Sequence, residues 1–153
     1  MNILAQYYAY AIIITMKNIS NIQYESTRHA KFLLSYHFIW CPKYRQSILD
    51  REEVVVAVRE TIESRIAEIG CTLIALEIMQ DHIHLSLSAP PRFSPAQLAG
   101  KIKGGSGSTL AARFPELRKK GSIWSRSYFC ATTGTVSTEV IRHYIETQWS
   151  RIA

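Results

Sequence analysis

Cysteine is scarce in this sequence, with only Cys41, Cys71 and Cys130 among 153 residues. The three are widely separated and form no CxxC pair, which excludes a zinc-finger arrangement. Their odd number and wide spacing also argue against a disulfide framework. Each lies in an apolar, strand-like run, so we expect three buried and reduced thiols.

The sequence also lacks an apolar run long enough to span a membrane, which takes about 20 residues. The segment ILAQYYAYAIIIT (residues 3–15) is shorter, and no basic residue precedes it as in a signal peptide. The internal Met16 opens a polar segment typical of a protein start. We therefore expect residues 1–26 to be an N-terminal extension outside the core, with Met1 or Met16 as the start, and residues 27–153 to form one domain.

Acidic residues are too few to balance the basic ones. The chain has 12 Asp and Glu against 18 Lys and Arg, a formal net charge of +6. This excess favours a polyanionic partner, most often a nucleic acid. The hydrophobic fraction of 47% is sufficient for a packed core and excludes a disordered chain.

A P-loop is absent as well. KIKGGSGS (residues 101–108) is rich in glycine, but no lysine follows its glycines, as GxxxxGK[ST] requires. The glycines predict a helix break or a close backbone approach, and they can let the backbone approach a nucleic-acid phosphate. The candidate DNA contacts are Lys43, Arg45, Lys101, Lys103, Gly104, Gly105, Ser106 and Arg126.

The rest of the chain alternates between strand-like and helical segments. Apolar, β-branched and aromatic runs predict strands at residues 32–41, 71–79, 82–88 and 123–132. With helices between them, the order is βαββαβ followed by a C-terminal helix. This order predicts an α+β, ferredoxin-like (RRM-like) fold, in which an antiparallel sheet carries helices on one face and leaves the other free for a ligand.

The expected helices have recognisable ends. Asp50 with Glu53 should cap the first, and Gly70 should end it. Ser94, followed by proline, should begin the second. Ser137 can cap the last.

HIHLSLS (residues 82–88) carries the clearest chemical signal. Successive side chains of a strand point to opposite faces, so one face receives His82, His84, Ser86 and Ser88. The other face, which would pack on the helices, receives Ile83, Leu85 and Leu87. Two imidazoles on an open face can chelate one divalent ion, although two solvated histidines would give the same pattern.

A third ligand must come from elsewhere, and the last helix offers one. Tyr144 and Gln148 are four residues apart and therefore share a helical face. The amide oxygen of Gln148 suits a hard cation, and Tyr144 places a phenol beside it. A helix that merely docks through an aromatic residue would show the same spacing.

Four segments, DHIHLSLS, KIKGGSGS, IWSRSYF and VIRHYIETQ, occur in this order over residues 31–152. Together they resemble the single-tyrosine HUH (His-hydrophobic-His) transposases, the transposase A proteins of the smallest bacterial and archaeal insertion sequences. The resemblance implies that His82, His84 and Gln148 bind a Mg²⁺ or Mn²⁺ ion and that Tyr144 is the nucleophile. It also implies cleavage and rejoining of single-stranded DNA through a 5′-phosphotyrosine.

The resemblance also implies the DNA partner, the oligomeric state and the cellular location. Family members recognise subterminal DNA hairpins and form homodimers in which the tyrosine helix can be exchanged between subunits. They act in the cytoplasm of bacteria or archaea, without a membrane.

Other functions remain open at this point. The chain could be a domesticated repeat-associated tyrosine transposase, or an HUH nickase of replication or plasmid transfer. The short chain and Gln148 favour the insertion-sequence kind. A non-catalytic nucleic-acid-binding module is a rival of another class, but such modules stack bases on sheet aromatics, where this chain has histidine and serine. An inactive transposon relic is a further alternative.

Overall fold

A four-stranded antiparallel sheet organises the structure, a computed structural model that describes residues 25–118 and 121–132. The strand order is β4-β5-β3-β6, and every neighbouring pair is antiparallel. The strands are β3 (Ser35–Trp40), β4 (Thr72–Ile78), β5 (Ile83–Ser88) and β6 (Phe129–Thr132).

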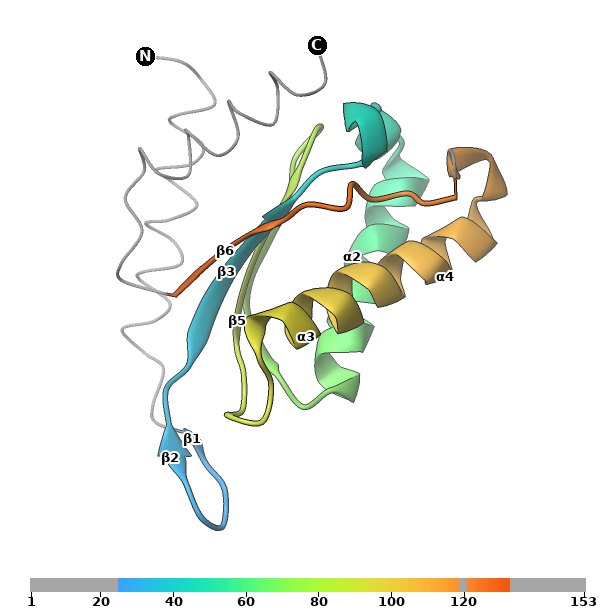
Figure 1. Cartoon of the computed structure of the whole chain (residues 1–153). Helices are drawn as coiled ribbons and strands as arrows, with labels where there is room; N and C mark the ends of the chain where they lie inside the picture. Colours follow the sequence, from blue (N-terminus) through green and yellow to red (C-terminus); the bar gives the residue numbers. More distant parts are fainter. Residues whose placement is uncertain (1–24, 119–120, 133–153) are drawn as a thin grey trace.

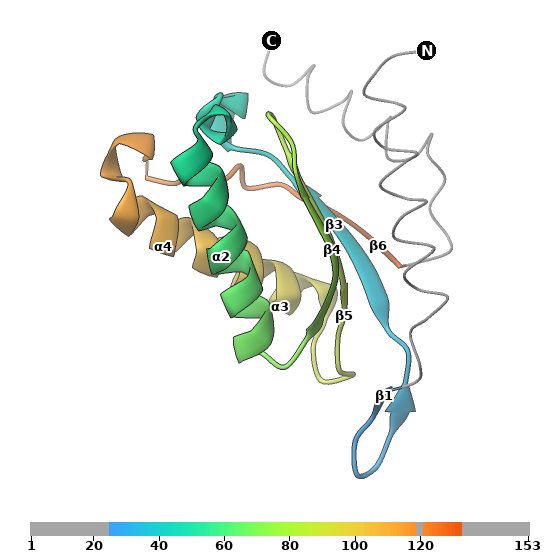
Figure 2. The ribbon, with the colours of Figure 1, turned by 180° about the vertical axis from the view of Figure 1, so that it is seen from behind.

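The helices cover one side of this sheet, as both views show (Figure 1, Figure 2). They are α2 (Glu52–Glu68), α3 (Pro95–Ala99) and α4 (Gly105–Arg113). Short helical turns, named η, complete the set: η1 (Lys43–Arg45), η2 (Ile48–Asp50), η3 (Gly100–Gly104) and η4 (Pro115–Leu117). The predicted α+β fold with the βαββαβ order is confirmed. The predicted C-terminal helix lies outside the described residues.

A small hairpin precedes the sheet. It pairs β1 (Glu25–Ser26) with β2 (Lys31–Phe32), and Ser88 Oγ donates a hydrogen bond of 2.6 Å to Glu25 Oε1. The expected domain boundary after residue 26 falls inside this hairpin. Residues 1–24 lie outside the described part, so the N-terminal extension stays a prediction.

The core lies between the sheet and the helices. Ile83, Leu85 and Leu87 of β5 are fully buried there, as the alternation predicted. They share one apolar cluster with Ile62 of α2 and Leu98 of α3. Burial of each such side chain contributes about 1.5–3 kcal/mol to the stability of the folded state.

Of the two predicted helix starts that fall within the described residues, one is wrong; the third, at Ser137, lies outside them. Asp50 ends η2, and α2 begins after Arg51, whose side chain makes no capping hydrogen bond. The short turn before α2 therefore places Asp50 too early to cap it. The start at Ser94 is confirmed by a capping box in which Gln97 N donates to Ser94 Oγ at 3.2 Å. The predicted end is also confirmed, because Gly70 has a φ of +72°.

The glycine-rich segment does not break its helix. The π-helical turn η3 joins α3 to α4 without interruption. The alternative, a close backbone approach, is confirmed at two positions. A Cβ at Gly105 would lie 2.9 Å from Arg65 Nε, and one at Gly107 would lie 2.9 Å from Trp124 Cδ1.

The last predicted strand is shorter than expected. β6 begins at Phe129, whereas the segment before it forms isolated bridges, one of which joins Trp124 to Pro42. The hydroxyls of Ser125 and Ser127 are 3.1 Å apart, and Ser127 N donates to Ser125 Oγ at 3.4 Å. Such side-chain hydrogen bonds compete with strand pairing, which is consistent with a strand that begins only at Phe129.

The thiols are free, but only Cys41 is buried; Cys71 and Cys130 are partly exposed, which corrects the expectation of three buried residues. Burial raises the pKa of each thiol to about 11, so all three are protonated at neutral pH. Among the described residues, no helix has the length and apolar character needed to cross a membrane.

Candidate functional site

The two histidines of HIHLSLS lie on the side of the sheet away from the helices, as alternation predicted. His84 is the second residue of β5 and lies between Ile39 of β3 and Glu77 of β4. His82 stands just before β5, where its carbonyl accepts a hydrogen bond of 2.9 Å from Met79 N in the β4–β5 turn. Strand pairing on both sides therefore fixes the backbone at His84, and the β4–β5 turn fixes it at His82.

Both imidazoles are buried, which corrects the expectation of an open, ligand-accessible position. The exposed fraction is 1% for His82 and 2% for His84. Every residue of β5, an interior strand of the sheet, is buried. Such a location excludes the alternative of two solvated histidines.

A third histidine lies beside them. The ring of His37, on β3, is 5.6 Å from the ring of His84 between centroids, and His37 Nδ1 is 2.8 Å from Ser86 Oγ. Burial, and then the charges of His37 and His82, lower the pKa of His84 to about 3. Burial also lowers the pKa of His37. His37 and His84 are therefore neutral at pH 7, the form that can donate a lone pair to a metal.

Sequence reasoning missed His37. Alternation along SYHFIW does place it on one face with Ser35 and Ile39. Its proximity to His84 depends on the β3–β5 register, in which His37 stands opposite Ser86.

A carboxylate orients His82. Asp81 Oδ1 accepts a hydrogen bond from His82 Nδ1 at 2.7 Å, and Asp81 Oδ2 forms an ion pair with Arg45 Nη2. Burial alone would raise the pKa of Asp81, but the hydrogen bond and charge of His82, and then those of Arg45, outweigh it and lower the pKa. Asp81 is therefore a carboxylate at neutral pH, and because it bonds to Nδ1 of His82, Nε2 is the ring nitrogen that could bind a metal.

Within the described residues, the two imidazoles of His82 and His84 are suitable ligands for a divalent ion. His82 has its Nδ1 bound to a carboxylate, and Nε2 of His84 has no hydrogen-bond partner among the described residues. Imidazole nitrogens in this state are ordinary metal ligands. Within residues 25–118 and 121–132, no group of three His, Cys, Asp or Glu side chains forms a metal site. The expected nucleophile Tyr144 and third ligand Gln148 lie outside the described residues.

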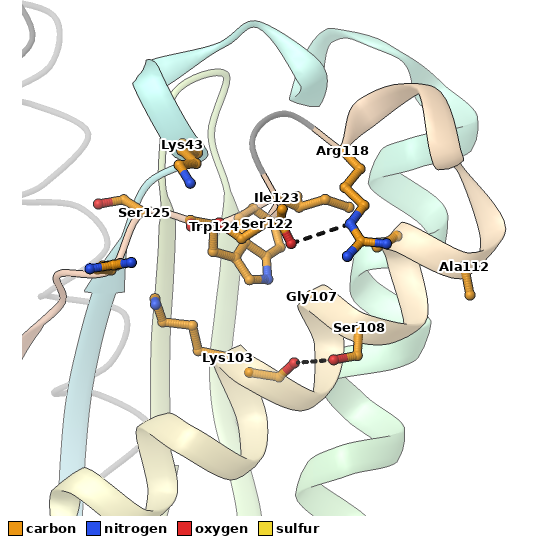
Figure 3. A pocket seen from close by; sticks show the side chains of 14 residues that line it. Lys43, Lys103, Gly107, Ser108, Ala112, Arg118, Ser122, Ile123, Trp124 and Ser125 are labelled. Carbon is orange, nitrogen blue, oxygen red and sulfur yellow. Dashed lines mark hydrogen bonds between the residues drawn. The ribbon is translucent and has the colours of Figure 1, made fainter.

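A second feature is a cavity of about 610 Å³ at the edge of the helical layer, between α4, η1 and the segment before β6 (Figure 3). Lys43 reaches into it from η1 and Lys103 from η3 (Figure 3). We call it the basic pocket, because its charged lining residues are Lys43, Lys103, Arg118 and Arg126. None of its lining residues in the described part of the chain is acidic.

The basic pocket collects four predicted DNA contacts: Lys43, Lys103, Gly104 and Arg126. Burial lowers the pKa of Lys103, so a phosphate beside it would offset an unfavourable desolvation of the ammonium. Arg118 was missed, although it opens the basic run RKK. Only the tertiary structure brings it to the same cavity as Lys43.

The other four predicted contacts do not line the basic pocket. Lys101 is exposed, with its Nζ 5.9 Å from the ring centroid of Phe93. Gly105 is packed against Arg65, and Ser106 is fully buried. The Arg45 side chain is only 5% exposed in its ion pair, so a phosphate could reach it only if that pair opened.

Comparison with known proteins adds a family-level similarity. The family model described as "Transposase IS200 like" matches residues 30–148. The ISDra2 transposase TnpA of Deinococcus radiodurans is 34% identical over 120 residues, which cover 76% of this chain and 85% of that protein. The transposase for insertion sequence element IS200 of Salmonella typhimurium is 31% identical over 130 residues, covering 81% of this chain and 82% of that protein.

Solved structures agree. A candidate transposase from Deinococcus radiodurans R1 superposes with a TM-score of 0.74 at 31% identity, over 81% of this chain and 97% of that one. A REP-associated tyrosine transposase bound to a REP hairpin has a TM-score of 0.51 at 16% identity, over 78% of this chain and 67% of that one. The second likeness concerns the fold alone.

Proposed function

The chain belongs to the IS200-like transposase family, and from this we propose that it cuts and rejoins single-stranded DNA at the ends of an insertion sequence, through a metal-dependent 5′-phosphotyrosine intermediate. A transposase is an enzyme that cleaves DNA, so DNA is its substrate and partner. The observation that carries the proposal is the buried pair His82 and His84, whose imidazoles stand ready as ligands next to the orienting carboxylate of Asp81.

We assign the nucleophile to Tyr144. Its phenolic oxygen would attack the phosphorus, and the bond from phosphorus to the 3′-oxygen would break. The phenol loses its proton, the 3′-oxygen gains one, and the products are a 5′-phosphotyrosine and a free 3′-OH. Because the phosphodiester is conserved in the covalent link, a 3′-OH can reverse the reaction without ATP. A phenol with a pKa of about 10 is a weak nucleophile at neutral pH and needs activation.

The residues proposed to hold the Mg²⁺ or Mn²⁺ ion are His82, His84 and Gln148. When bound, the ion acts as a Lewis acid on the scissile phosphate and helps to orient it. The chain prepares two of these ligands: burial keeps His84 neutral, and Asp81 fixes the orientation of His82. The sheet fixes the backbone at His84, and the hydrogen bond to Asp81 orients the ring of His82, which together favour a reproducible geometry.

We assign the basic pocket to the DNA backbone. It has four cationic side chains and no acidic lining residue in the described part of the chain, which favours a phosphodiester over a neutral ligand. The serine hydroxyls of Ser108, Ser122 and Ser125 supply further hydrogen-bonding groups. Subterminal hairpins of the element are the proposed DNA, and a homodimer that exchanges the tyrosine helix is the proposed assembly. Residues 27–153 are the proposed catalytic domain, with residues 1–26 as an extension.

The decisive experiment incubates the purified full chain with labelled single-stranded oligonucleotides from the ends of its element and Mg²⁺ or Mn²⁺. We expect a covalent adduct between the protein and the 5′ end of the cleaved strand, visible by denaturing gel. The adduct should be lost with EDTA and with Tyr144→Phe, which removes only the attacking oxygen. Tyr44→Phe, at an exposed tyrosine, is the matched control and should retain it. An adduct that persists in Tyr144→Phe would refute the assigned nucleophile.

A further inference from the structure

Asp81 bridges Arg45 and His82 through its two oxygens. Oδ1 is 2.7 Å from His82 Nδ1, and Oδ2 pairs with Arg45 Nη2. The side chains of His82 and Arg45 are 1% and 5% exposed, and that of Asp81 is 20% exposed. The side chains of Arg45, Asp81 and His82 therefore form one largely buried hydrogen-bonded network.

This arrangement determines which nitrogen of His82 carries hydrogen. A carboxylate that is paired with a guanidinium has no proton to donate, so Nδ1 of His82 must be the donor. In the neutral ring, Nε2 then holds the lone pair. Carboxylates bonded in this way to ligating histidines set the tautomer and the ring orientation in many metal sites.

Arg45 reaches Asp81 because of an unusual turn. Tyr44 and Arg45 have φ values of +56° and +48°, a left-handed conformation that residues other than glycine rarely adopt. The turn is held by hydrogen bonds from Lys43 N to Ile123 O at 2.7 Å and from Arg45 N to Pro42 O at 2.9 Å. Backbone conformations of this kind are concentrated at functional sites, and here the turn carries the side chain that pairs with Asp81.

The turn also separates Lys43 from Arg45. Lys43 lines the basic pocket, whereas the guanidinium of Arg45, two residues later, is paired with Asp81. Neighbouring basic residues in one short segment thus have different surroundings. This difference argues that Arg45 serves the histidine and Lys43 serves the DNA.

We propose that Arg45 and Asp81 are positioning residues that hold His82 with Nδ1 protonated and direct its Nε2 at the catalytic metal ion. The proposal rests on the proposed function, because it assumes that His82 is a metal ligand. It adds that metal affinity depends on two residues that contact neither the ion nor DNA. Asp81 acts directly on the imidazole, and Arg45 acts by holding Asp81.

The first test measures Mn²⁺ binding alone, by calorimetry, with the full chain and no DNA. Asp81→Asn should weaken Mn²⁺ binding by about 10–100-fold, the usual effect of losing such a partner. Arg45→Met, which keeps the apolar stem, should weaken it less. Asp50→Asn, at an exposed aspartate, is the matched control and should bind as the wild type does. Wild-type affinity in Asp81→Asn would overturn the proposal.

The second test needs no metal and no activity. ¹⁵N NMR of the metal-free wild type should show His82 with Nδ1 protonated and Nε2 unprotonated, and Asp81→Asn should reduce this tautomer. An unprotonated Nδ1 in the wild type would overturn the proposal. If circular dichroism shows that Asp81→Asn does not fold, both measurements are made on Arg45→Met instead.

A third comparison separates this role from DNA contact. Metal-free Arg45→Met should bind single-stranded DNA with wild-type affinity. Loss of DNA affinity together with unchanged Mn²⁺ binding would overturn the proposal in favour of a phosphate contact. A wild type that binds Mn²⁺ through His82 but forms no DNA adduct would refute the proposed function, while the positioning role would stand.

Discussion

Trp124 Nε1 donates a hydrogen bond of 3.1 Å to Ser106 Oγ, which in turn donates one of 2.9 Å to the carbonyl of Lys103. Ser106 is fully buried, and Trp124 is 4% exposed. The hydroxyl thus ties the segment before β6 to the helix that carries Lys103. Since Trp124 and Lys103 both line the basic pocket, this pair of hydrogen bonds holds two of its walls together.

Ser106→Ala should therefore destabilise the protein. The variant leaves the buried indole N–H without its acceptor, a loss worth about 1–3 kcal/mol. Urea unfolding followed by circular dichroism measures it. Ser108→Ala is the matched control, because Ser108 is exposed and its hydroxyl donates to the carbonyl of Gly104, one turn earlier in the same helix. Equal stabilities of the two variants would contradict the structural role of Ser106.

Gly107→Ala and Gly100→Ala should change stability in opposite directions. A Cβ at Gly107 would lie 2.9 Å from Trp124 Cδ1, so the indole must move, at a cost of about 1–3 kcal/mol. A Cβ at Gly100 would meet nothing within 4 Å, and its helical backbone accepts alanine with a gain of about 0.4–1 kcal/mol. The free energy of unfolding of both variants tests this, and a stabilised Gly107→Ala would refute the close approach.

Lys103→Ala should weaken DNA binding more than Lys101→Ala. Lys103 lines the basic pocket and Lys101 does not, although both belong to η3. Loss of one phosphate contact lowers the salt dependence of binding by about one unit in slope. Fluorescence anisotropy with a labelled hairpin oligonucleotide, measured at several salt concentrations, would show this difference. The same slope and affinity in both variants would remove Lys103 from the DNA interface.

His84→Ala should abolish most of the Mn²⁺ affinity. Loss of a direct ligand should exceed the roughly 10–100-fold effect of losing an outer hydrogen-bond partner. His29→Ala is the matched control, because His29 is exposed in the turn between β1 and β2. Calorimetry gives the affinity, and circular dichroism checks that the variant is folded. Undiminished binding in folded His84→Ala would exclude this histidine as a ligand.

Local pattern was a good guide to the sheet. The alternation in HIHLSLS predicted which side of β5 meets the helices, because the two-residue period of a strand is a property of the backbone itself. Ser94 followed by proline predicted a helix start for the same kind of reason, since the capping box that forms there closes within four residues. The end of the first helix at Gly70 was likewise a local matter of backbone conformation.

Predictions that depended on distant neighbours succeeded less well. The Asp50 cap was wrong because η2 intervenes, and the strand at residues 123–132 was too long because serine side chains compete with pairing. The sequence could not decide between a helix break and a close approach at its glycines, because Arg65 and Trp124 reach them only in three dimensions.

The candidate site divides in the same way. The sequence was sufficient to indicate the family and its chemistry, because the spacing of His82 and His84 and the order of the motifs are properties of the sequence itself. Tertiary structure alone decided that His37 lies beside His84, that Arg118 joins the basic pocket, and that Arg45 faces Asp81. The reasons are strand register, the convergence of separate segments on one cavity, and a left-handed turn, and each depends on contacts between residues far apart in sequence.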